Sequence, residues 1–154
     1  MAEERTDPVV TVTGSLVDQR LDDEQAESWL GGDIRHSRGL RERQVVEWSD
    51  PRLPAIKNSV FNYIQYPHPT RVTAVFEGSH LLVDDDGSWA GTSTGVSYPD
   101  GSIEGQDILV GRGAYEGLYA VLHARAEIAP GDGGTTVWRG MIFTGSAPPA
   151  PKSS

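Results

Sequence analysis

The sequence predicts an all-β domain: a single antiparallel, roughly eight-stranded up-and-down β-barrel with little helix. Apolar and polar residues alternate over short segments, and turn residues recur about every 8–12 positions. The 154-residue chain also contains 18 glycines and 10 prolines, which favour turns over long helices. Closure into a barrel removes exposed strand edges and leaves an interior that fits side chains or one small ligand. A two-sheet sandwich is the alternative.

The first third of the chain contains two predicted strands and one ambiguous region. Residues 9–17 alternate between valine or leucine and threonine or serine, which is typical of a half-buried strand. Residues 18–39 have no continuous apolar stripe, so a helical turn, an exposed strand and a long loop all stay open there. The next strand ends at Trp48, because residues 49–54 contain two prolines that remove backbone donors.

Six further strands are predicted, over residues 56–66, 72–83, 89–98, 102–110, 116–128 and 135–145. Residues 84–87 end in Asp-Gly, which supplies the positive backbone angles of a tight hairpin. The predicted barrel domain covers residues 8–145. Residues 1–7 and the proline- and serine-rich residues 146–154 are expected to be disordered ends.

The composition excludes several classes of function. Thirteen Lys and Arg against 22 Asp and Glu give a net charge of −9, which repels phosphate backbones, so we expect no nucleic-acid partner. The absence of cysteine excludes disulfides, thiolate metal sites and cysteine nucleophiles. The acidic start does not resemble a secretory signal, and no apolar stretch approaches the ~20 residues of a membrane helix. We therefore expect no membrane partner and take the cytoplasm as the default location.

Three motifs invite a cofactor or metal and are better explained otherwise. Residues 111–117 have the spacing G-x-G-x-x-x-G and precede a strand, which does not fit a dinucleotide-binding loop. Residues 84–87 lack the ligand spacing of an EF-hand. The four histidines form no short-spaced zinc pair. The sequence therefore predicts neither a cofactor nor a metal site.

Short motifs over roughly residues 40–145 resemble a known family pattern. They are residues 48–52 (WSDPR), 87–92 (GSWAGT), 98–101 (YPDG), 111–118 (GRGAYEGL) and 138–140 (WRG). This pattern is similar to that of small bacterial β-barrels of the allene oxide cyclase and dirigent type, within the calycin group. The resemblance implies an eight-stranded barrel with a lumen for a hydrophobic small molecule, and cofactor-free cyclisation or coupling, in some bacterial relatives on polyketides. No catalytic residue of those families matches a position here.

Polar residues that interrupt apolar strand faces are the candidate site residues. They are Asn58 and Asn62 within residues 56–64, Asp107 within residues 103–109, and Arg139 within residues 137–143. On a lumen face each needs a partner or a ligand atom, because an unpaired buried polar group costs about 1–3 kcal/mol and a charge more. We predict that Asp107 and Arg139 are catalytic and that the two asparagines bind the ligand. A structural Asp107–Arg139 ion pair, or a reversed face, is the alternative.

Trp89 and Met141 are predicted to line the apolar wall of the lumen, because aromatic rings and the flexible thioether suit an irregular ligand. The leading hypothesis is a cofactor-independent cyclase or isomerase that acts on a hydrophobic small molecule, mostly by positioning it, in bacterial secondary metabolism. A non-catalytic, lipocalin-like binding barrel is the main alternative, and a barrel packed solid by its own side chains is a third. Homo-oligomer formation stays open.

Overall fold

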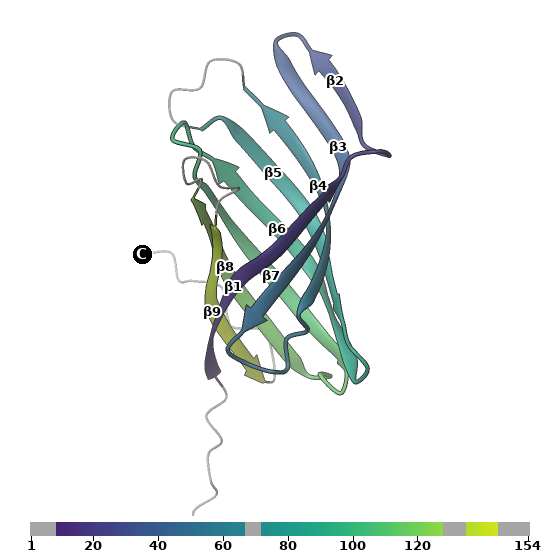
Figure 1. Ribbon diagram of the computed structural model, residues 1–154, viewed down its shortest axis with the longest axis vertical. Helices are drawn as coiled ribbons and strands as arrows, with labels where there is room; N and C mark the ends of the chain where they lie inside the picture. Colours follow the sequence, from purple (N-terminus) through teal and green to yellow (C-terminus); the bar gives the residue numbers. More distant parts are fainter. Residues whose placement is uncertain (1–8, 67–71, 128–134, 145–154) are drawn as a thin grey trace, which may run out of the picture.

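The computed structural model describes residues 9–66, 72–127 and 135–144, and this part of the chain contains nine β-strands and no helix, hence none that could span a membrane (Figure 1). The strands are β1 (Val9–Asp22), β2 (Glu27–Gly31), β3 (Ile34–Trp48), β4 (Ile56–Gln65), β5 (Ala74–Val83), β6 (Gly87–Ser97), β7 (Ile103–Gly113), β8 (Leu118–Glu127) and β9 (Thr135–Thr144). The predicted disordered ends, residues 1–7 and 146–154, lie outside the described residues.

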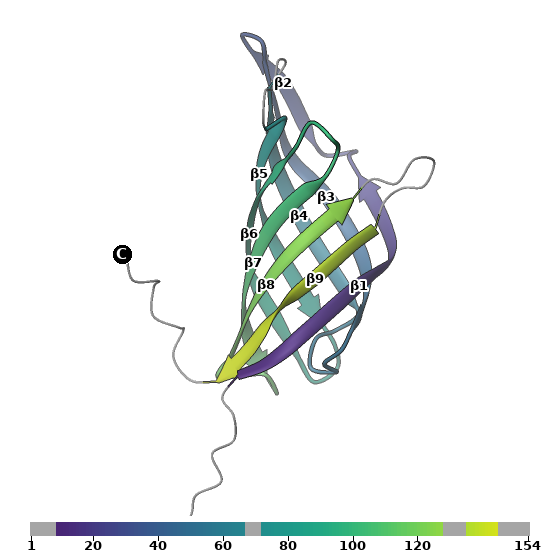
Figure 2. The same ribbon diagram turned by 90° about the vertical axis from the view of Figure 1, so that its left-hand side faces the viewer.

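Eight of the strands form a closed ring. From β3 to β9 each strand pairs antiparallel with the next, β9 pairs with β1, and β1 pairs with β3. Figures 1 and 2 show the resulting barrel, whose strands are tilted against its long axis. The predicted up-and-down barrel is therefore confirmed, and the sandwich alternative is wrong. β2 is a ninth strand, paired with β3 outside the ring.

Residues 18–39 contain an exposed strand rather than a helical turn or a long loop. β1 continues to Asp22, and β2 then pairs with the start of β3 from Glu27 opposite Arg38 to Gly31 opposite Ile34. All five residues of β2 are exposed, and Figure 1 shows the β2–β3 hairpin extending beyond one end of the barrel. A strand that buries neither face needs no apolar stripe, so the sequence pattern does not distinguish it from a helical turn or a loop.

Side chains alternate between the lumen and the outer surface. On β4, Lys57, Ser59 and Phe61 are buried, whereas Asn58 and Val60 between them are exposed. Since successive side chains of a strand point to opposite faces, the odd-numbered residues of β4 line the lumen. The even-numbered face, which carries both candidate asparagines, lies outside.

The lumen is filled with apolar side chains at the end opposite the β2–β3 hairpin, which we call the closed end. The core cluster comprises Val12, Val46, Leu53, Leu82, Trp89, Leu109, Tyr115, Ala120, Leu122, Trp138 and Ile142. The loop between β3 and β4 covers this end, because the indole nitrogens of Trp89 and Trp48 donate to the carbonyl oxygens of Arg52 (2.8 Å) and Pro54 (3.0 Å). The closed end therefore resembles an ordinary hydrophobic core.

The hairpin turn predicted at residues 84–87 is present, but the stated role of its glycine is wrong. Asp84 Oδ1 accepts hydrogen bonds from the backbone N–H groups of Asp86 and Gly87, both at 2.9 Å. Gly87 does not have a positive φ. It is required for space instead, since a Cβ there would lie 2.3 Å from the carbonyl oxygen of Arg112.

Candidate functional site

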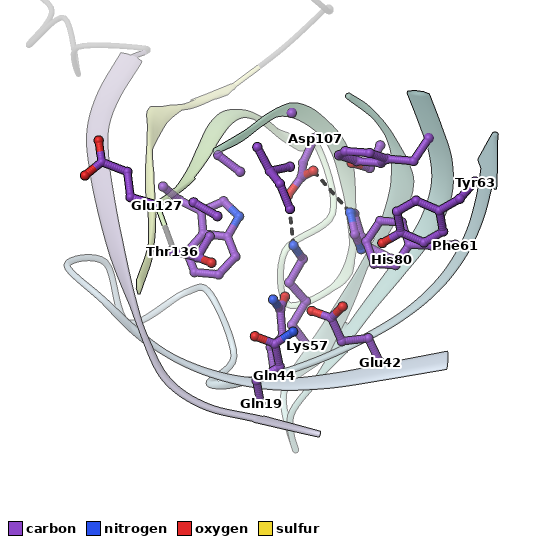
Figure 3. A pocket seen from close by; sticks show the side chains of 17 residues that line it. Gln19, Glu42, Gln44, Lys57, Phe61, Tyr63, His80, Asp107, Glu127 and Thr136 are labelled. Carbon is purple, nitrogen blue, oxygen red and sulfur yellow. Dashed lines mark hydrogen bonds and ion pairs between the residues drawn. The ribbon is translucent and has the colours of Figure 1, made fainter. Parts of the chain in front are cut away.

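The half of the lumen away from the closed end contains a cavity of about 200 Å³. Seventeen of the described residues line it, and Figure 3 shows their side chains converging from several strands of the barrel. The walls are of two kinds: a charged and polar floor next to the apolar core, and an aromatic and aliphatic wall nearer the β2–β3 hairpin. A hollow lumen is therefore present, and the solid-core alternative is wrong.

The floor is built around Asp107 of β7. Lys57 Nζ lies 3.0 Å from Asp107 Oδ2, and His80 Nε2 lies 3.1 Å from Asp107 Oδ1. Ser59 Oγ lies 2.5 Å from the other ring nitrogen of His80. Figure 3 shows Lys57 and His80 both pointing toward Asp107. The result is a buried chain of four polar side chains from β4, β5 and β7.

The protonation states follow from these contacts. Burial alone would raise the pKa of Asp107, but the hydrogen bond from His80 and the charge of Lys57 outweigh it and hold this pKa well below its usual range. Burial lowers the pKa of His80 despite its hydrogen bond to Asp107, so the imidazole is neutral at neutral pH. A carboxylate only accepts hydrogen bonds, so His80 Nε2–H donates to Asp107 and Nδ1 accepts from the Ser59 hydroxyl.

Glu42 and Gln44 of β3 face the same cavity. Burial raises the pKa of Glu42, and this effect exceeds the opposing influence of the Lys57 charge and of a hydrogen bond with Gln44. A carboxyl group whose pKa moves toward neutrality is better suited to accept and release protons at neutral pH. Burial, together with the negative charge of Glu42, raises the pKa of Tyr63 to about 12, so the phenol stays protonated.

The wall formed by β4 and β5 beyond His80 is aromatic. The Phe76 ring packs against Phe61 and Tyr63 with centroid distances of 5.7 and 5.5 Å. Two lumen-facing glycines make room for it: a Cβ on Gly95 would lie 2.2 Å from the Phe76 ring, and one on Gly105 would lie 3.3 Å away. The two glycines therefore leave the space that the Phe76 ring occupies.

A Ser–His–Asp order invites comparison with hydrolases that use an activated serine. Here the Ser59 side chain is buried and is not among the described residues that line the cavity. A nucleophile must reach the substrate. We therefore interpret the Ser59–His80 hydrogen bond as fixing the imidazole ring rather than activating the serine.

Two of the six predicted site residues face the lumen. Asp107 lies on the cavity floor, as described above. Trp89 is completely buried, but it belongs to the apolar core of the closed end and does not line the cavity. The prediction that Trp89 lines a ligand-binding wall therefore does not match its position.

The other four predicted residues lie on the outer surface. Arg139 and Asn58 are exposed, Met141 is 46% exposed, and Asn62 is half-buried and accepts a hydrogen bond from the backbone N–H of Gly39. The Asp107–Arg139 ion pair is therefore wrong, and Lys57 and His80 are the partners of Asp107. On β9 the lumen face contains Trp138 and Ile142, and the set that includes Met141 faces outward.

Sequence reasoning does not identify Lys57, His80, Glu42 or Gln44 as site residues. The signal available for Lys57 was its spacing from Phe61 and Tyr63, since all three share one face of β4. A lysine that alternates with aromatic residues can belong to a lumen, but it is more often read as solvent-exposed. In this barrel the charged side chain of Lys57 faces the lumen, opposite to the usual expectation that a lysine faces solvent.

Within residues 9–66, 72–127 and 135–144, no group of three or more His, Asp or Glu side chains is arranged to hold a metal ion. Comparisons with known protein families, with characterised proteins and with solved structures found no match for this chain. The resemblance to allene oxide cyclase and dirigent-type barrels is therefore supported only as far as a small all-β, eight-stranded barrel.

Proposed function

We propose that the barrel binds a small carbonyl compound in its lumen and catalyses isomerisation or ring closure by proton transfer, without a cofactor. The observation that carries this proposal is the position of Glu42, a buried carboxyl group with a raised pKa, beside the Lys57–Asp107 ion pair in one cavity. A proton-exchanging group and a cation at the same cavity are the two elements that enolisation of a carbonyl requires.

The size of the cavity supports a substrate with one ring. A dry cavity of about 150 Å³ is large enough to bind benzene, and pockets for drug-sized ligands measure about 300–1,000 Å³. At about 200 Å³, this cavity suits a ring with one or two small substituents. Its polar end lies against Lys57 and Glu42, and its apolar end lies against Phe61 and Phe76.

The chemical step uses only groups of the chain and of the substrate. Lys57 Nζ donates a hydrogen bond to the carbonyl oxygen, while the Glu42 carboxylate removes a proton from the neighbouring carbon. The electron pair of that C–H bond forms the enolate. In a substrate whose next two carbons share a double bond, this enolate is conjugated with it, so the Glu42 proton returns to the far carbon of that double bond while the double bond moves next to the carbonyl group. The product has the same formula as the substrate, so the step needs no oxidant, reductant or co-reactant.

Ring closure follows when the same molecule carries a second carbonyl group. The enolate carbon forms a bond to that carbonyl carbon, and its oxygen takes the proton from Glu42. Holding both reacting carbons together supplies up to about 7–11 kcal/mol of the barrier in favourable cases. This step is consistent with the cyclase function that the resemblance implies, and with a place in secondary metabolism.

Asp107 and His80 are positioning residues in this mechanism. The carboxylate of Asp107 accepts from both Lys57 and His80, and His80 is fixed in turn by Ser59. A lysine held by such a network keeps one orientation, which is what a group that polarises a carbonyl needs.

A non-catalytic binding barrel is the second candidate. The ion pair between Lys57 and Asp107 favours it. The two side chains neutralise each other, and both are almost fully buried. An ion pair of this kind can serve structure alone. In that case the cavity binds the same class of molecule and returns it unchanged.

Exchange of carbon-bound hydrogen distinguishes the two candidates without knowledge of the natural substrate. Cyclohexanone in D₂O is incubated with the protein, and the loss of its α-proton signal is followed by NMR. We expect wild type to accelerate exchange over buffer, and Glu42→Gln to lose about 100-fold of that acceleration or more. Glu47→Gln, at an exposed position on the same strand, is the matched control and is expected to retain it.

One outcome would contradict catalysis, and another would contradict only the role given to Glu42. Exchange at the buffer rate with ketone bound would leave only the binding barrel. Equal exchange by wild type and Glu42→Gln would remove the assigned role of Glu42. Ala124→Leu tests whether exchange takes place in the lumen, because the larger side chain fills space beside the cavity. Ala90→Leu is its control, since it adds the same side chain to an outward-facing residue of β6.

A further inference from the structure

Two buried polar atoms at the cavity lack a hydrogen-bond partner. They are the indole nitrogen of Trp138, a donor, and Oε1 of Gln44, an acceptor. Within the described residues, no other buried side-chain nitrogen or oxygen is in this state. Buried polar groups in folded proteins are nearly always paired, so each unpaired group needs an explanation.

The contrast with half-buried Trp48 and buried Trp89 makes Trp138 distinctive. The indole nitrogens of Trp48 and Trp89 both donate to backbone carbonyl oxygens in the loop between β3 and β4. Trp138 is 1% exposed, and its ring lines the cavity with Lys57 Nζ 4.8 Å from the ring centroid. Its N–H group is therefore buried next to space that a ligand can occupy.

The charges around the cavity determine what kind of ligand is accepted. Lys57 is neutralised by Asp107, and the remaining acidic residues that line the cavity are Glu42 and Glu127. A carboxylate ligand would bring another negative charge close to both acidic side chains with no unpaired cation to offset it. An uncharged ligand avoids this repulsion.

We infer that the lumen selects an uncharged monocyclic compound that carries a carbonyl group next to a hydrogen-bond donor. Its carbonyl oxygen accepts from Trp138 Nε1–H as well as from Lys57 Nζ, and its donor is bound by Gln44 Oε1. The inference rests on the proposed function, because it names the substrate class for the same cavity. It adds Trp138 and Gln44 as the residues that determine specificity.

Binding of δ-valerolactam tests this pattern, since this ring has a carbonyl beside an N–H and cannot undergo the proposed ring closure. Cyclohexanone and N-methyl-2-piperidinone keep the carbonyl and lack the donor, and cyclohexanecarboxylate is the anionic control. Each probe is titrated into ¹⁵N-labelled full-length protein, and the indole N–H signals are followed by NMR. Through-space contacts to Ala124, which pairs with Trp138 in register, assign the relevant signal without a substitution.

We expect the lactam to move the Trp138 indole signal and to leave those of Trp48 and Trp89 in place, because these are already bonded. It should bind at least about five-fold more tightly than either donor-free ring, a ratio typical of one hydrogen bond. Gln44→Met should abolish this preference, whereas Gln106→Met, on the exposed face of β7, should leave it intact. Trp138→Phe should weaken the lactam and cyclohexanone alike.

Equal binding of the lactam and the donor-free rings would overturn the inference, as would tightest binding of the carboxylate. A Trp138 signal that no probe moves would also overturn it and would assign the two unpaired atoms to water. These failures are separate from failure of the proposed function. Lactam binding with the expected pattern, but no α-proton exchange in cyclohexanone, would retain the specificity and remove the catalysis.

Discussion

Lys57 on β4 and Asp107 on β7 form an ion pair across the lumen, 50 residues apart in sequence, with side chains that are 3% and 2% exposed. β5 and β6 separate their strands in the sheet. The pair therefore joins two parts of the barrel wall that share no backbone hydrogen bonds. It also marks the boundary between the apolar closed end and the cavity.

Replacing one partner of this pair should destabilise the barrel strongly. Lys57→Met leaves the Asp107 charge buried with only the neutral His80 beside it, so we expect a loss of about 3–5 kcal/mol in the free energy of unfolding. Urea unfolding followed by tryptophan fluorescence measures it. The control is Arg125→Ala, which breaks surface pairs with Glu104 at 4.0 Å and Glu127 at 3.4 Å and should cost less than about 1 kcal/mol.

The double variant Lys57→Met, Asp107→Leu separates the value of the pair from the cost of an unpaired charge. It removes both charges and should recover much of the stability that the single variant loses, because no ion is left buried without a partner. A double variant as unstable as Lys57→Met alone would contradict this explanation.

The contribution of His80 to the stability of the protein should decrease as the pH falls below 6.5. Burial lowers the pKa of this imidazole in the folded state from 6.5, so below that pH the unfolded chain binds more protons than the folded one. Unfolding is then favoured as the pH falls, until the folded-state pKa is passed. His80→Gln should flatten this dependence, as measured by urea unfolding at a series of pH values.

His123→Gln is the matched control for this prediction, since His123 is exposed on the outer face of β8. It should leave the slope of stability against pH unchanged. The comparison uses slopes rather than absolute stabilities, because His80→Gln also removes the hydrogen bonds to Asp107 and Ser59. Equal slopes in wild type and His80→Gln would show that another group causes the dependence.

The fold could be predicted because each strand of a barrel wall has one solvent-exposed face and one buried face along most of its length. The alternation in residues 118–128 and the turn at residues 84–87 encode this directly. The β2–β3 hairpin could not be predicted, since β2 is exposed on both faces and its sequence carries no period. The alternation of apolar and polar residues arises from burial of one strand face, so a strand with no buried face does not show it.

The site could be predicted only in part. Asp107 was found because a charge between Ile103 and Leu109 stands out on an apolar face. Its partners could not be found by spacing, because Lys57 and His80 reach it from strands 50 and 27 residues away. Alternation alone also does not tell which of two partly apolar faces points inward, so the pattern around Met141 fits a lumen position as well as its observed outward one.

Glu42→Gln should stabilise the protein at neutral pH. Burial raises the pKa of Glu42, so the folded state favours the protonated form and is penalised above the raised pKa, where the carboxylate is charged. The neutral amide avoids this penalty, and the gain should disappear below about pH 4.5, where the carboxyl group is protonated in both states. Thermal unfolding at several pH values measures the difference.

The exposed Glu47 on the same strand supplies the control, and Glu47→Gln should change the stability little at any pH. A decrease in stability with Glu42→Gln at neutral pH would mean that the carboxylate is held as an ion by Lys57. In that case Glu42 would not be suited to return protons to a substrate.

Leu53→Ala should weaken the closed end while leaving the cavity unchanged. Leu53 lies in the loop between β3 and β4, is 4% exposed and belongs to the core cluster, so its truncation should cost about 2–5 kcal/mol in urea unfolding. Leu81→Ala, at a position that is 44% exposed on the outer face of β5, is the control and should cost much less. Because Leu53 does not line the cavity, δ-valerolactam should bind the folded Leu53→Ala protein with wild-type affinity. A large loss of affinity together with the loss of stability would mean that the two halves of the lumen are coupled, and that the closed end helps to shape the site.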